Sequence, residues 1–564
     1  MPPKQRPLII LLILIIPSIF FFLKPGLYWN MHDDMQLIRQ LELEKCLNDG
    51  QIPCRWTPDL GYGYGYPLFN FYPPLPYAVG TLFRATGFTF ITTIKLTAAL
   101  QFIFAAVGMY LLAATFYGPI GGLISGLLYT YAPYHAVNVY IRGAMNEAWA
   151  SVFFPFIFYF AYLAIYRQKR VYYLLLSLSY ALLLLSHNPM ALTFSPFLGC
   201  WILYHLYQSH QLSNLKIYFS LFFSLLGSLC LSAYFSLPVI FESPLVQIET
   251  MFQNYYYYSI HFASFYQLFI SNFWGDGPSV WGTQDGMPFS LGYLLSLISL
   301  TSFILSLYSY YRTKKINHLI FILFPLSVFS IFLAHERSTF IWKLFPLIQK
   351  IQFPWRFLNI STFLFSLLAG SIILHFHHRN NLKIYLLAAI IVVTSLIDLR
   401  HFYPVTSGPI TDSQKFSGLA WTNQVTGGIY DYLPQTAPTA PRSPAAPYLD
   451  SLDPAATKYS LTGQKKGTDW LFFNISLANS ATISLPVLYF PNFKLIVDNI
   501  DTPIIPDSQL GRISFKLNSG NHQVYLKLHD TPIRSIGNTI SLFSILLFIY
   551  LFITTLWNQR KLKP

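Results

Sequence analysis

Apolar runs of about 17–25 residues recur along the chain, and short polar stretches separate them. A run of this length crosses the hydrocarbon core of a bilayer as a helix. The pattern therefore predicts a multi-span α-helical membrane protein with about twelve transmembrane helices. The expected spans are residues 7–23, 92–115, 118–135, 148–166, 171–186, 189–207, 216–236, 290–310, 318–334, 356–376, 382–398 and 536–557.

Basic residues predict the orientation of these spans. The short apolar stretch 75–83 is interpreted as re-entrant or interfacial, and all the basic clusters then fall on one side of the membrane. Cytoplasmic loops carry an excess of Lys and Arg, so both termini are expected in the cytoplasm. The clusters are Lys4/Arg6, Arg167/Lys169/Arg170, Lys216, Arg312/Lys314/Lys315, Arg379/Lys383 and Arg560/Lys561/Lys563.

The opposite face collects the long loops, including residues 24–91 and 237–289. After residue 398 the chain turns polar, passes a Pro/Ala/Thr-rich linker at 435–447, and then alternates apolar and polar positions like antiparallel strands. We expect a transmembrane domain at 1–398, a small extracytoplasmic β-sandwich within 399–535, and a last helix with a basic tail at 536–564.

Composition agrees with a membrane protein, since only 10% of the residues are charged, against about 25% in soluble domains. The net charge of +14 does not indicate nucleic-acid binding, because the basic residues sit in short clusters between apolar runs. Cys46 and Cys54 lie within one loop, and a disulfide between them is left open. No Cys/His metal spacing, Walker motif or G-x-S-x-G motif is present.

An acidic loop follows the first span, with His32, Asp33 and Asp34 in adjacent positions. Apolar residues spaced three apart between residues 33 and 46 predict a short amphipathic helix on the membrane interface, and Asp33 could simply cap it. Adjacent loop residues usually point apart. We therefore expect one aspartate to face a cavity and the other to cap the helix, with Asp33 narrowly favoured for chemistry. Tyr/Gly/Pro-rich turns at 61–67 are expected at headgroup depth.

Further ionisable and polar residues fall on the same face, and together they predict one cavity. A carboxylate there could act as a general base toward a hydroxyl, and arginines suit a lipid phosphate. Simpler roles remain open: an ion pair at a helix start for Arg142 and Glu147, turn chemistry for His187, and an interface anchor for Arg356. The candidates are Arg142, Glu147, His187, Asn188, Glu242, Arg337, Trp355 and Arg356.

An outward acidic loop followed by Tyr72-Pro-Pro-Leu-Pro76 resembles the polytopic glycosyltransferases of the GT-C fold, such as protein O-mannosyltransferases and aminoarabinose lipid A transferases. More closely, the chain resembles bacterial YfhO-type membrane proteins labelled "6-pyruvoyl-tetrahydropterin synthase-related". The segments that carry this likeness are 133–149, Leu185-Ser-His-Asn-Pro-Met190, Gln352-Phe-Pro-Trp-Arg-Phe357, and Leu488-Tyr-Phe-Pro-Asn-Phe493 followed by Val497-Asp498.

The resemblance implies sugar transfer from a polyprenyl-phosphate donor to a glycan, lipid or protein acceptor, outside a bacterial-type cytoplasmic membrane. By position, Asp33 or Asp34 matches the general base of the first outer loop, and Glu147 matches a second acidic residue. Arg142, Arg337 and Arg356 are candidates for the lipid phosphate. No cofactor is expected, although the adjacent aspartates leave a divalent cation possible.

Two other functions compete with the enzyme. One is a transporter or flippase for a lipid-linked saccharide, and the other is a cell-envelope assembly protein whose outer domain binds glycan. A transporter would show internal repeats with broken spans at the midplane, and no convincing repeat is found. An assembly protein should not need Asp33, Asp34, Arg142 and Glu147 together.

Overall fold

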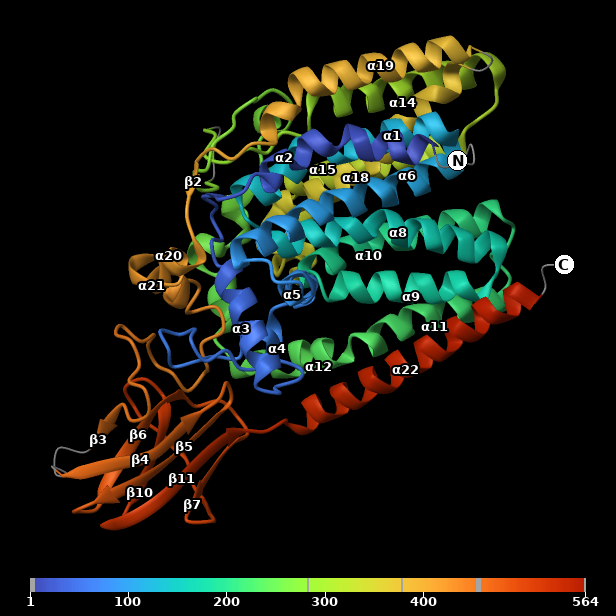
Figure 1. Cartoon of the computed structure of the whole chain (residues 1–564). Helices are drawn as coiled ribbons and strands as arrows, with labels where there is room; N and C mark the ends of the chain where they lie inside the picture. Colours follow the sequence, from blue (N-terminus) through green and yellow to red (C-terminus); the bar gives the residue numbers. More distant parts are fainter. Residues whose placement is uncertain (1–5, 281, 283, 377–378, 453–457, 562–564) are drawn as a thin grey trace.

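The protein is described by a computed structural model that covers residues 6–280, 282, 284–376, 379–452 and 458–561. Lys4 and Lys563 of the predicted basic clusters lie outside this range, and the side chains of Arg560 and Lys561 are not described. A bundle of long helices carries a β-domain at one end, and both chain termini lie at the other end (Figure 1). Which membrane face each end meets stays a prediction.

Every predicted span is helical. Among the described residues, six helices are long and apolar enough to cross a membrane, or up to nine if each bent pair of helices forms one span. The count of twelve crossings therefore stays a prediction. The helices are α1 (Arg6–Leu14) and α2 (Ile16–Leu23), α6 (Phe90–Thr130), α8 (Met145–Arg167), α9 (Arg170–Leu184), α10 (Asn188–Gln208), α11 (Leu215–Leu231), α14 (Tyr293–Thr313), α15 (His318–Ala334), α18 (Phe357–Ala369), α19 (Asn380–Ile397) and α22 (Pro532–Lys561).

The long element α6 is a helical hairpin. Gly118 interrupts it with φ 75° and ψ 179°, a conformation that glycine adopts without steric cost, and Pro119 follows. A methyl group at Gly122 would meet the Cβ atom of Ala114 at 2.8 Å, so the two arms pack closely beyond the turn. The arms correspond to the predicted spans 92–115 and 118–135.

The surroundings of helix α3 (Gln36–Asn48) differ from their prediction. The sequence indicated an amphipathic helix on the membrane interface, yet its polar residues Gln36, Arg39, Gln40 and Glu42 are buried. The helix is enclosed because α5 (Leu75–Ala85) and α6 pack against it, and polar side chains bond each other inside this packing. The other short helices are α4 (Leu68–Phe71), α7 (Pro133–Ala136), α12 (Ala233–Glu242), α13 (Phe265–Phe269), α16 (Thr339–Leu344), α17 (Pro346–Gln349), α20 (Asp412–Lys415) and α21 (Gly418–Thr426).

The β-domain holds two antiparallel sheets, as the alternation predicted. Buried side chains of both sheets, such as Phe473 and Phe515, share one hydrophobic core. One sheet has the order β3 (Ser451–Leu452), β6 (Ala481–Leu488), β10 (Arg512–Leu517), β9 (Ile505–Pro506); the other has β4 (Tyr459–Lys466), β5 (Trp470–Leu477), β11 (Gly520–Leu528), β7 (Phe493–Val497), β8 (Ile500–Thr502). A separate pair, β1 (Leu27–Trp29) and β2 (Ser407–Pro409), joins the loop at 24–91 to the segment after α19. We call this loop the first outer loop after its predicted side of the membrane.

The first outer loop also packs on the β-domain. Tyr64 and Tyr66 are buried in the core that holds the two sheets, and the backbone N–H of Leu488 bonds the carbonyl oxygen of Tyr64 at 3.1 Å. These tyrosines therefore belong to an interdomain contact and not to a free headgroup belt. Cys46 and Cys54 of the same loop form a disulfide.

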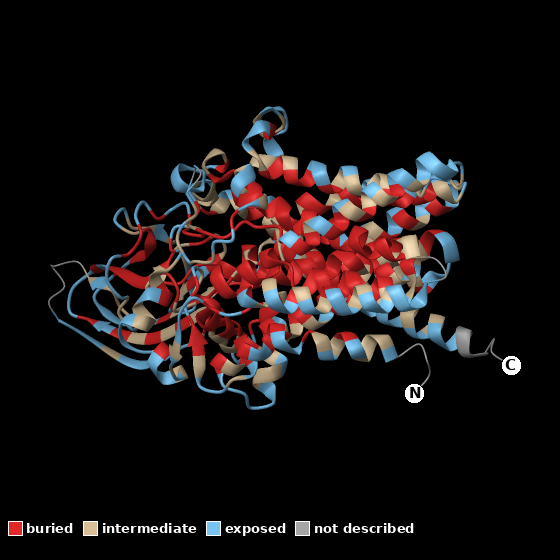
Figure 2. Cartoon of the chain, turned by 90° about the horizontal axis from the view of Figure 1, so that it is seen from above, coloured by how far each residue is buried: buried red, intermediate tan, exposed pale blue. Residues whose placement is uncertain are grey.

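Burial is concentrated along the middle of the helical bundle (Figure 2). In the helical segment Pro354–Phe376, which includes α18, 94% of the most apolar stretch is buried. In α19 and α22 the buried share of the corresponding stretch is only 17% and 11%. The exposed faces of α19 and α22 are apolar, which suits contact with lipid.

Candidate functional site: a buried arginine cluster beside an acidic loop

The segment between α7 and α8 places two of the predicted residues. Residues Val137–Ile141 form a single π-helical turn, a feature often found at functional sites, and Arg142 follows it directly. Gly143, at φ 63°, then turns the chain into α8, whose first turn carries Glu147. The sharp turn brings the two side chains together, so that Arg142 Nη2 lies 2.9 Å from Glu147 Oε2.

Glu147 is only 1% exposed, and four side chains donate to its carboxylate. Its Oε2 atom accepts from Arg142 and from Arg356 Nε at 3.1 Å. Its Oε1 atom accepts from Asn359 Nδ2 at 2.7 Å and from the Tyr134 hydroxyl at 3.2 Å. A buried carboxylate with both oxygens bonded in this way has little capacity left to take up a proton from a substrate.

Arg356 reaches the same carboxylate from the turn Pro354–Arg356, just before α18. Its Nη1 atom donates to Ile351 O at 2.6 Å and to Gln352 Oε1 at 3.0 Å. The neighbouring Trp355 ring lies under the Arg142 guanidinium, 4.3 Å from its central carbon. Arg142, Arg356 and Glu147 together carry a formal charge of +1. We call these three residues the arginine cluster.

Each arginine of the cluster has a nitrogen whose hydrogen-bond donor is unused in the described part of the chain. Within the described residues, no hydrogen bond is made by Arg142 Nε or Arg356 Nη2, and neither atom is sealed from solvent. Burial by itself would lower the pKa of Arg142, but Glu147 and Tyr134 more than offset it and raise that pKa. Arginine side chains stay protonated in proteins, so both guanidinium groups are cations that an anion could share.

The acidic loop lies against this cluster. The backbone N–H of His32 bonds Ile141 O at 3.0 Å, and that of Asp33 bonds Arg142 O at 2.9 Å. The Asp33 side chain is 33% exposed, and only its Oδ2 atom is bonded, by Arg39 Nη1 at 2.6 Å and Gln36 Nε2 at 3.2 Å. The Oδ1 atom of Asp33 has no hydrogen-bond partner in the part of the chain that the structure describes.

Asp34 points elsewhere and pairs with Lys415 at the end of α20. Burial raises the pKa of Asp34 even though Lys415 opposes the shift. As predicted, the two aspartate side chains point in different directions. Neither of them caps α3, because its N-cap residue is Met35, which makes no side-chain cap hydrogen bond. Each carboxylate thus has one oxygen paired with a cation, but they differ in access: the second oxygen of Asp33 is open to solvent, whereas Asp34 Oδ1 is buried.

Asp431 adds a third carboxylate near the acidic loop. Burial raises its pKa to about 6, and its charge interacts with Arg39 and Asp33. The charges of Asp431 and Asp33 also contribute to a raised pKa of the exposed Tyr256. The loop after α12, which carries Tyr256, therefore borders the same region. Among the described residues, no three His, Cys, Asp or Glu side chains are grouped so that they could hold a metal ion.

The predicted histidines lie at the edge of the site. His32 is exposed, and its Nε2 atom lies 2.7 Å from Asp276 O. His187 accepts from Met190 N at 3.2 Å and caps α10, which Asn188 begins. Burial, with help from Arg356, lowers the pKa of His187 to about 3, so the ring is neutral at physiological pH. This cap is the turn role that the sequence left open for His187.

Two predicted residues lie outside the arginine cluster. Glu242 is 3% exposed and bonds Arg534 Nε of α22 at 2.8 Å and Asn70 Nδ2 at 2.8 Å, so it ties the last helix to the first outer loop. Arg337 is exposed on the turn Glu336–Ser338. Within the described chain, no carboxylate pairs with Arg337.

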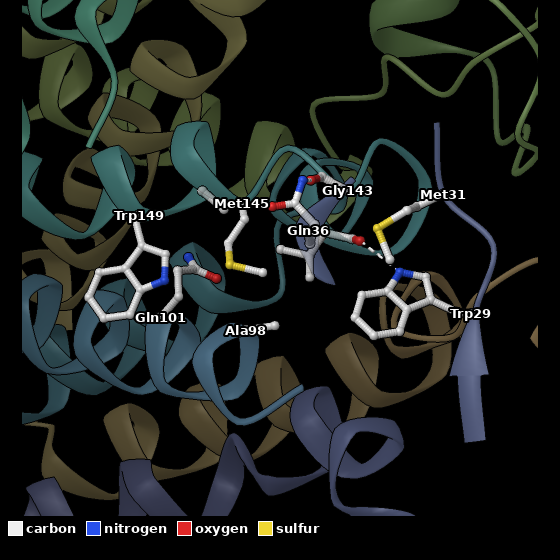
Figure 3. A pocket seen from close by; sticks show the side chains of 10 residues that line it. Trp29, Met31, Gln36, Ala98, Gln101, Gly143, Met145 and Trp149 are labelled. Atoms are coloured by element: carbon white, nitrogen blue, oxygen red, sulfur yellow. Dashed lines mark hydrogen bonds between the residues drawn. The ribbon is translucent and has the colours of Figure 1, made fainter. Parts of the chain in front are cut away.

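A small cavity lies next to the segment that carries Arg142 and Glu147, because Gly143, Met145 and Ala148 line it. Figure 3 shows this cavity and its lining side chains. The cavity measures about 10 Å³, which is room for about one water molecule. Met31, Met145, Trp29 and Trp149 line it, with the Gln36 and Gln101 side chains between them. The cavity is too small for a sugar.

Several residues of the site were missed from the sequence. Asn359 follows Arg356 by three positions, and helical spacing could have placed both on one face. Arg39 lies six residues after Asp33 and could have been weighed as its partner. Lys415 and Asp431 come from a polar segment nearly 400 residues away, and no local pattern links them to the acidic loop.

Comparisons with known proteins give distant similarities. No family model matches the chain. An uncharacterized protein of Lactococcus lactis subsp. cremoris (strain MG1363) is 23% identical over 239 residues, which are 41% of this chain and 39% of that protein. The chain thus spans well under half of this relative.

Two solved structures of the Archaeoglobus fulgidus oligosaccharyltransferase are also similar. The one tethered to an acceptor peptide with the NVT sequon has a TM-score of 0.42 at 14% identity, covering 79% of this chain and 60% of that one. The complex with Zn and sulfate has a TM-score of 0.38 at 15% identity, covering 78% and 58%. Neither likeness identifies a family for the chain.

Proposed function

We propose that the protein is a membrane glycosyltransferase that moves a sugar from a polyprenyl-phosphate-linked donor to a hydroxyl acceptor, with Asp33 as general base. One observation carries this proposal: Asp33 keeps an unbonded, solvent-reachable oxygen while its backbone is hydrogen-bonded to Arg142 of a buried cluster with net positive charge. A base and an anion-binding group thus stand side by side at the end of a helical bundle.

The arginine cluster is suited to the donor phosphate. Departure of the polyprenyl phosphate adds negative charge to its oxygens, and fixed guanidinium groups favour that change more strongly in a buried setting than in water. Arg142 and Arg356 each keep an N–H group that no described residue accepts. Asp33 Oδ1 would take the acceptor's hydroxyl proton as the oxygen attacks the anomeric carbon.

Glu147 acts in this proposal as a positioning residue. Its carboxylate is fully engaged by Arg142, Arg356, Asn359 and Tyr134, so it fixes the two guanidinium groups and takes no proton. Asp34 is less accessible than Asp33, because Lys415 holds one of its oxygens and the other is buried away from solvent. This leaves Asp33 as the carboxylate with open capacity in the acidic loop.

We place this site and the β-domain outside the cytoplasmic membrane. The basic clusters belong to the opposite end of the spans, which is the cytoplasmic side by the positive-inside rule. The disulfide Cys46–Cys54 fits the same orientation, because disulfides persist in oxidising compartments. The acceptor would then be a glycan, lipid or protein of the cell envelope.

The test is sugar transfer by the purified full-length protein in liposomes. A panel of polyprenyl-monophosphate hexoses and pentoses is supplied with an extract of envelope glycans and lipids, and release of polyprenyl phosphate is measured by mass spectrometry. We expect Asp33→Asn to lower release by about 10²–10⁴-fold. Asp501→Asn, an exposed aspartate of β8, is the matched control.

Full release by both Asp33→Asn and Asp34→Asn would contradict the base assignment. Movement of the donor across the bilayer without release of polyprenyl phosphate would instead identify a flippase.

A further inference from the structure

A second, larger cavity lies between the loop after α3 and the β-domain, away from the arginine cluster. Its volume is about 520 Å³, within the usual range of sites for small ligands. One wall is formed by residues within 45–64 of the first outer loop. The other is formed by residues 445–447 before the β-domain and by residues 466–471, 486–487, 493 and 526 of the β-domain. In Figure 1 this loop lies against the sheets, although some 400 residues separate the two walls.

Hydrogen bonds between the two walls fix their positions relative to each other, and hence the shape of this interdomain cavity. Asp49 Oδ2 accepts from Thr468 N at 2.6 Å and from Thr468 Oγ1 at 2.8 Å. Gln51 Nε2 donates to the same hydroxyl at 2.9 Å. Both Asp49 and Gln51 lie in the loop that the disulfide Cys46–Cys54 closes. A site fixed in advance loses less entropy when a ligand binds.

Aromatic side chains line the interdomain cavity. The Trp470 indole is partly exposed, and its Nε1 atom lies 3.3 Å from Asp49 Oδ1, which fixes the orientation of the ring. Trp56 and Tyr64 also line the cavity and are largely buried. A fixed indole face packs well on the C–H face of a sugar ring, while polar groups at its edge can meet the hydroxyls.

The charges of the interdomain cavity nearly cancel. Its lining includes Asp49, Asp59, Asp469, Lys45 and Lys466, a formal charge of −1, and Lys45 is paired with Asp59. A polyanion such as nucleic acid would find no positive surface here. Carboxylates only accept hydrogen bonds, so the ligand must offer donors. A neutral ligand rich in hydroxyl groups satisfies both conditions.

The geometry points to a binding site for a neutral oligosaccharide in this interdomain cavity. The sugar ring stacks on Trp470, and its hydroxyls donate to the aspartates around the rim. This assignment does not rest on sugar transfer at Asp33, since the two sites share no residue.

The experiment uses the full-length protein in lipid nanodiscs. Cellohexaose, maltohexaose, mannohexaose and chitohexaose are titrated separately, together with an uncharged hexapeptide of similar length, and binding is followed by calorimetry. At least one saccharide should bind saturably, and Trp470→Ala should weaken it about tenfold or more. Tyr459→Ala, an exposed aromatic on β4 that does not line the cavity, should leave the affinity unchanged.

A second variant guards against misfolding of Trp470→Ala. Ala446→Trp adds volume to the lining without removing a side chain that holds the walls together, and it should also weaken saccharide binding. The inference is overturned if no saccharide binds, if the peptide binds in its place, or if both variants bind saccharide as the unaltered protein does. Undiminished donor release by Asp33→Asn and by Asp34→Asn, with retained saccharide binding, would overturn the proposed transfer at Asp33 alone.

Discussion

The backbone N–H of Asp33 donates a 2.9 Å hydrogen bond to the carbonyl oxygen of Arg142. This bond aligns the acidic loop with the turn that carries the arginine cluster, and the Asp33 charge contributes to the raised pKa of Arg142. Neither residue could be moved without shifting the other, because His32 N bonds Ile141 O in the same way. The proposed chemistry thus depends on backbone pairing between two loops.

Glu147→Gln should destabilise the whole helical bundle. The substitution leaves Arg142 and Arg356 buried without a counter-charge, and breaking one partner of a buried ion pair costs about 3–5 kcal/mol. We expect a clearly lower Tm in detergent micelles. Glu249→Gln, an exposed glutamate in the loop after α12, should leave Tm unchanged. Equal Tm values for both variants would show that Glu147 does not hold the cluster together.

The Glu242–Arg534 pair should anchor α22 to the rest of the protein. Arg534 is fully buried, so Arg534→Met leaves Glu242 as an unpaired buried charge, at a cost of about 3–5 kcal/mol. The double variant Glu242→Gln/Arg534→Met removes both charges and should recover part of the lost Tm, which reveals the coupling between the two residues. Additive losses of Tm would mean that the pair contributes no coupling.

The sequence predicted the helices well because span length and apolarity are local properties. It also predicted strands in the β-domain, where apolar and polar residues alternate at 512–517 and more and less buried residues alternate at 522–528. It was wrong about the surroundings of α3, since whether a polar face meets water or other polar side chains depends on tertiary packing. Arg39 and Glu42 look exposed in the sequence, yet both are buried.

The candidate site was predicted where its members lie close in the chain. Arg142 and Glu147 are five residues apart, and their pairing follows from one turn before a helix. Glu242 was predicted to share that site. In the structure it forms an ion pair with Arg534 instead, because α22 packs on α12. No local pattern shows which of several outward charges a distant helix will reach.

Asp431 should make stability depend on pH. Its folded pKa of about 6 lies above the ordinary value, so the folded state binds the extra proton and stability falls as pH rises from about 4 to 6. Asp431→Asn should raise stability above pH 6 by about 1–2 kcal/mol, less than the full linkage value because the side chain keeps some solvent contact.

The measurement for Asp431 is Tm as a function of pH between 4 and 8. The difference between Asp431→Asn and the unaltered protein should be largest above pH 6 and vanish near pH 4. Asp501→Asn serves as the control with an exposed carboxylate. If the Tm difference stays constant across this pH range, the pKa of Asp431 in the folded protein is not raised above its ordinary value.

The disulfide Cys46–Cys54 should stabilise the contact between the first outer loop and the β-domain. It closes the loop that carries Asp49 and Gln51, the partners of Thr468. Loop-closure entropy gives a short disulfide about 2–3 kcal/mol. In Cys46→Ser/Cys54→Ser we expect earlier unfolding in denaturant and faster proteolysis after residue 50. Cys200→Ser, which removes an exposed free thiol, is the control. If the double variant resists protease as the unaltered protein does, the hydrogen bonds to Thr468 alone suffice to hold the loop on the β-domain.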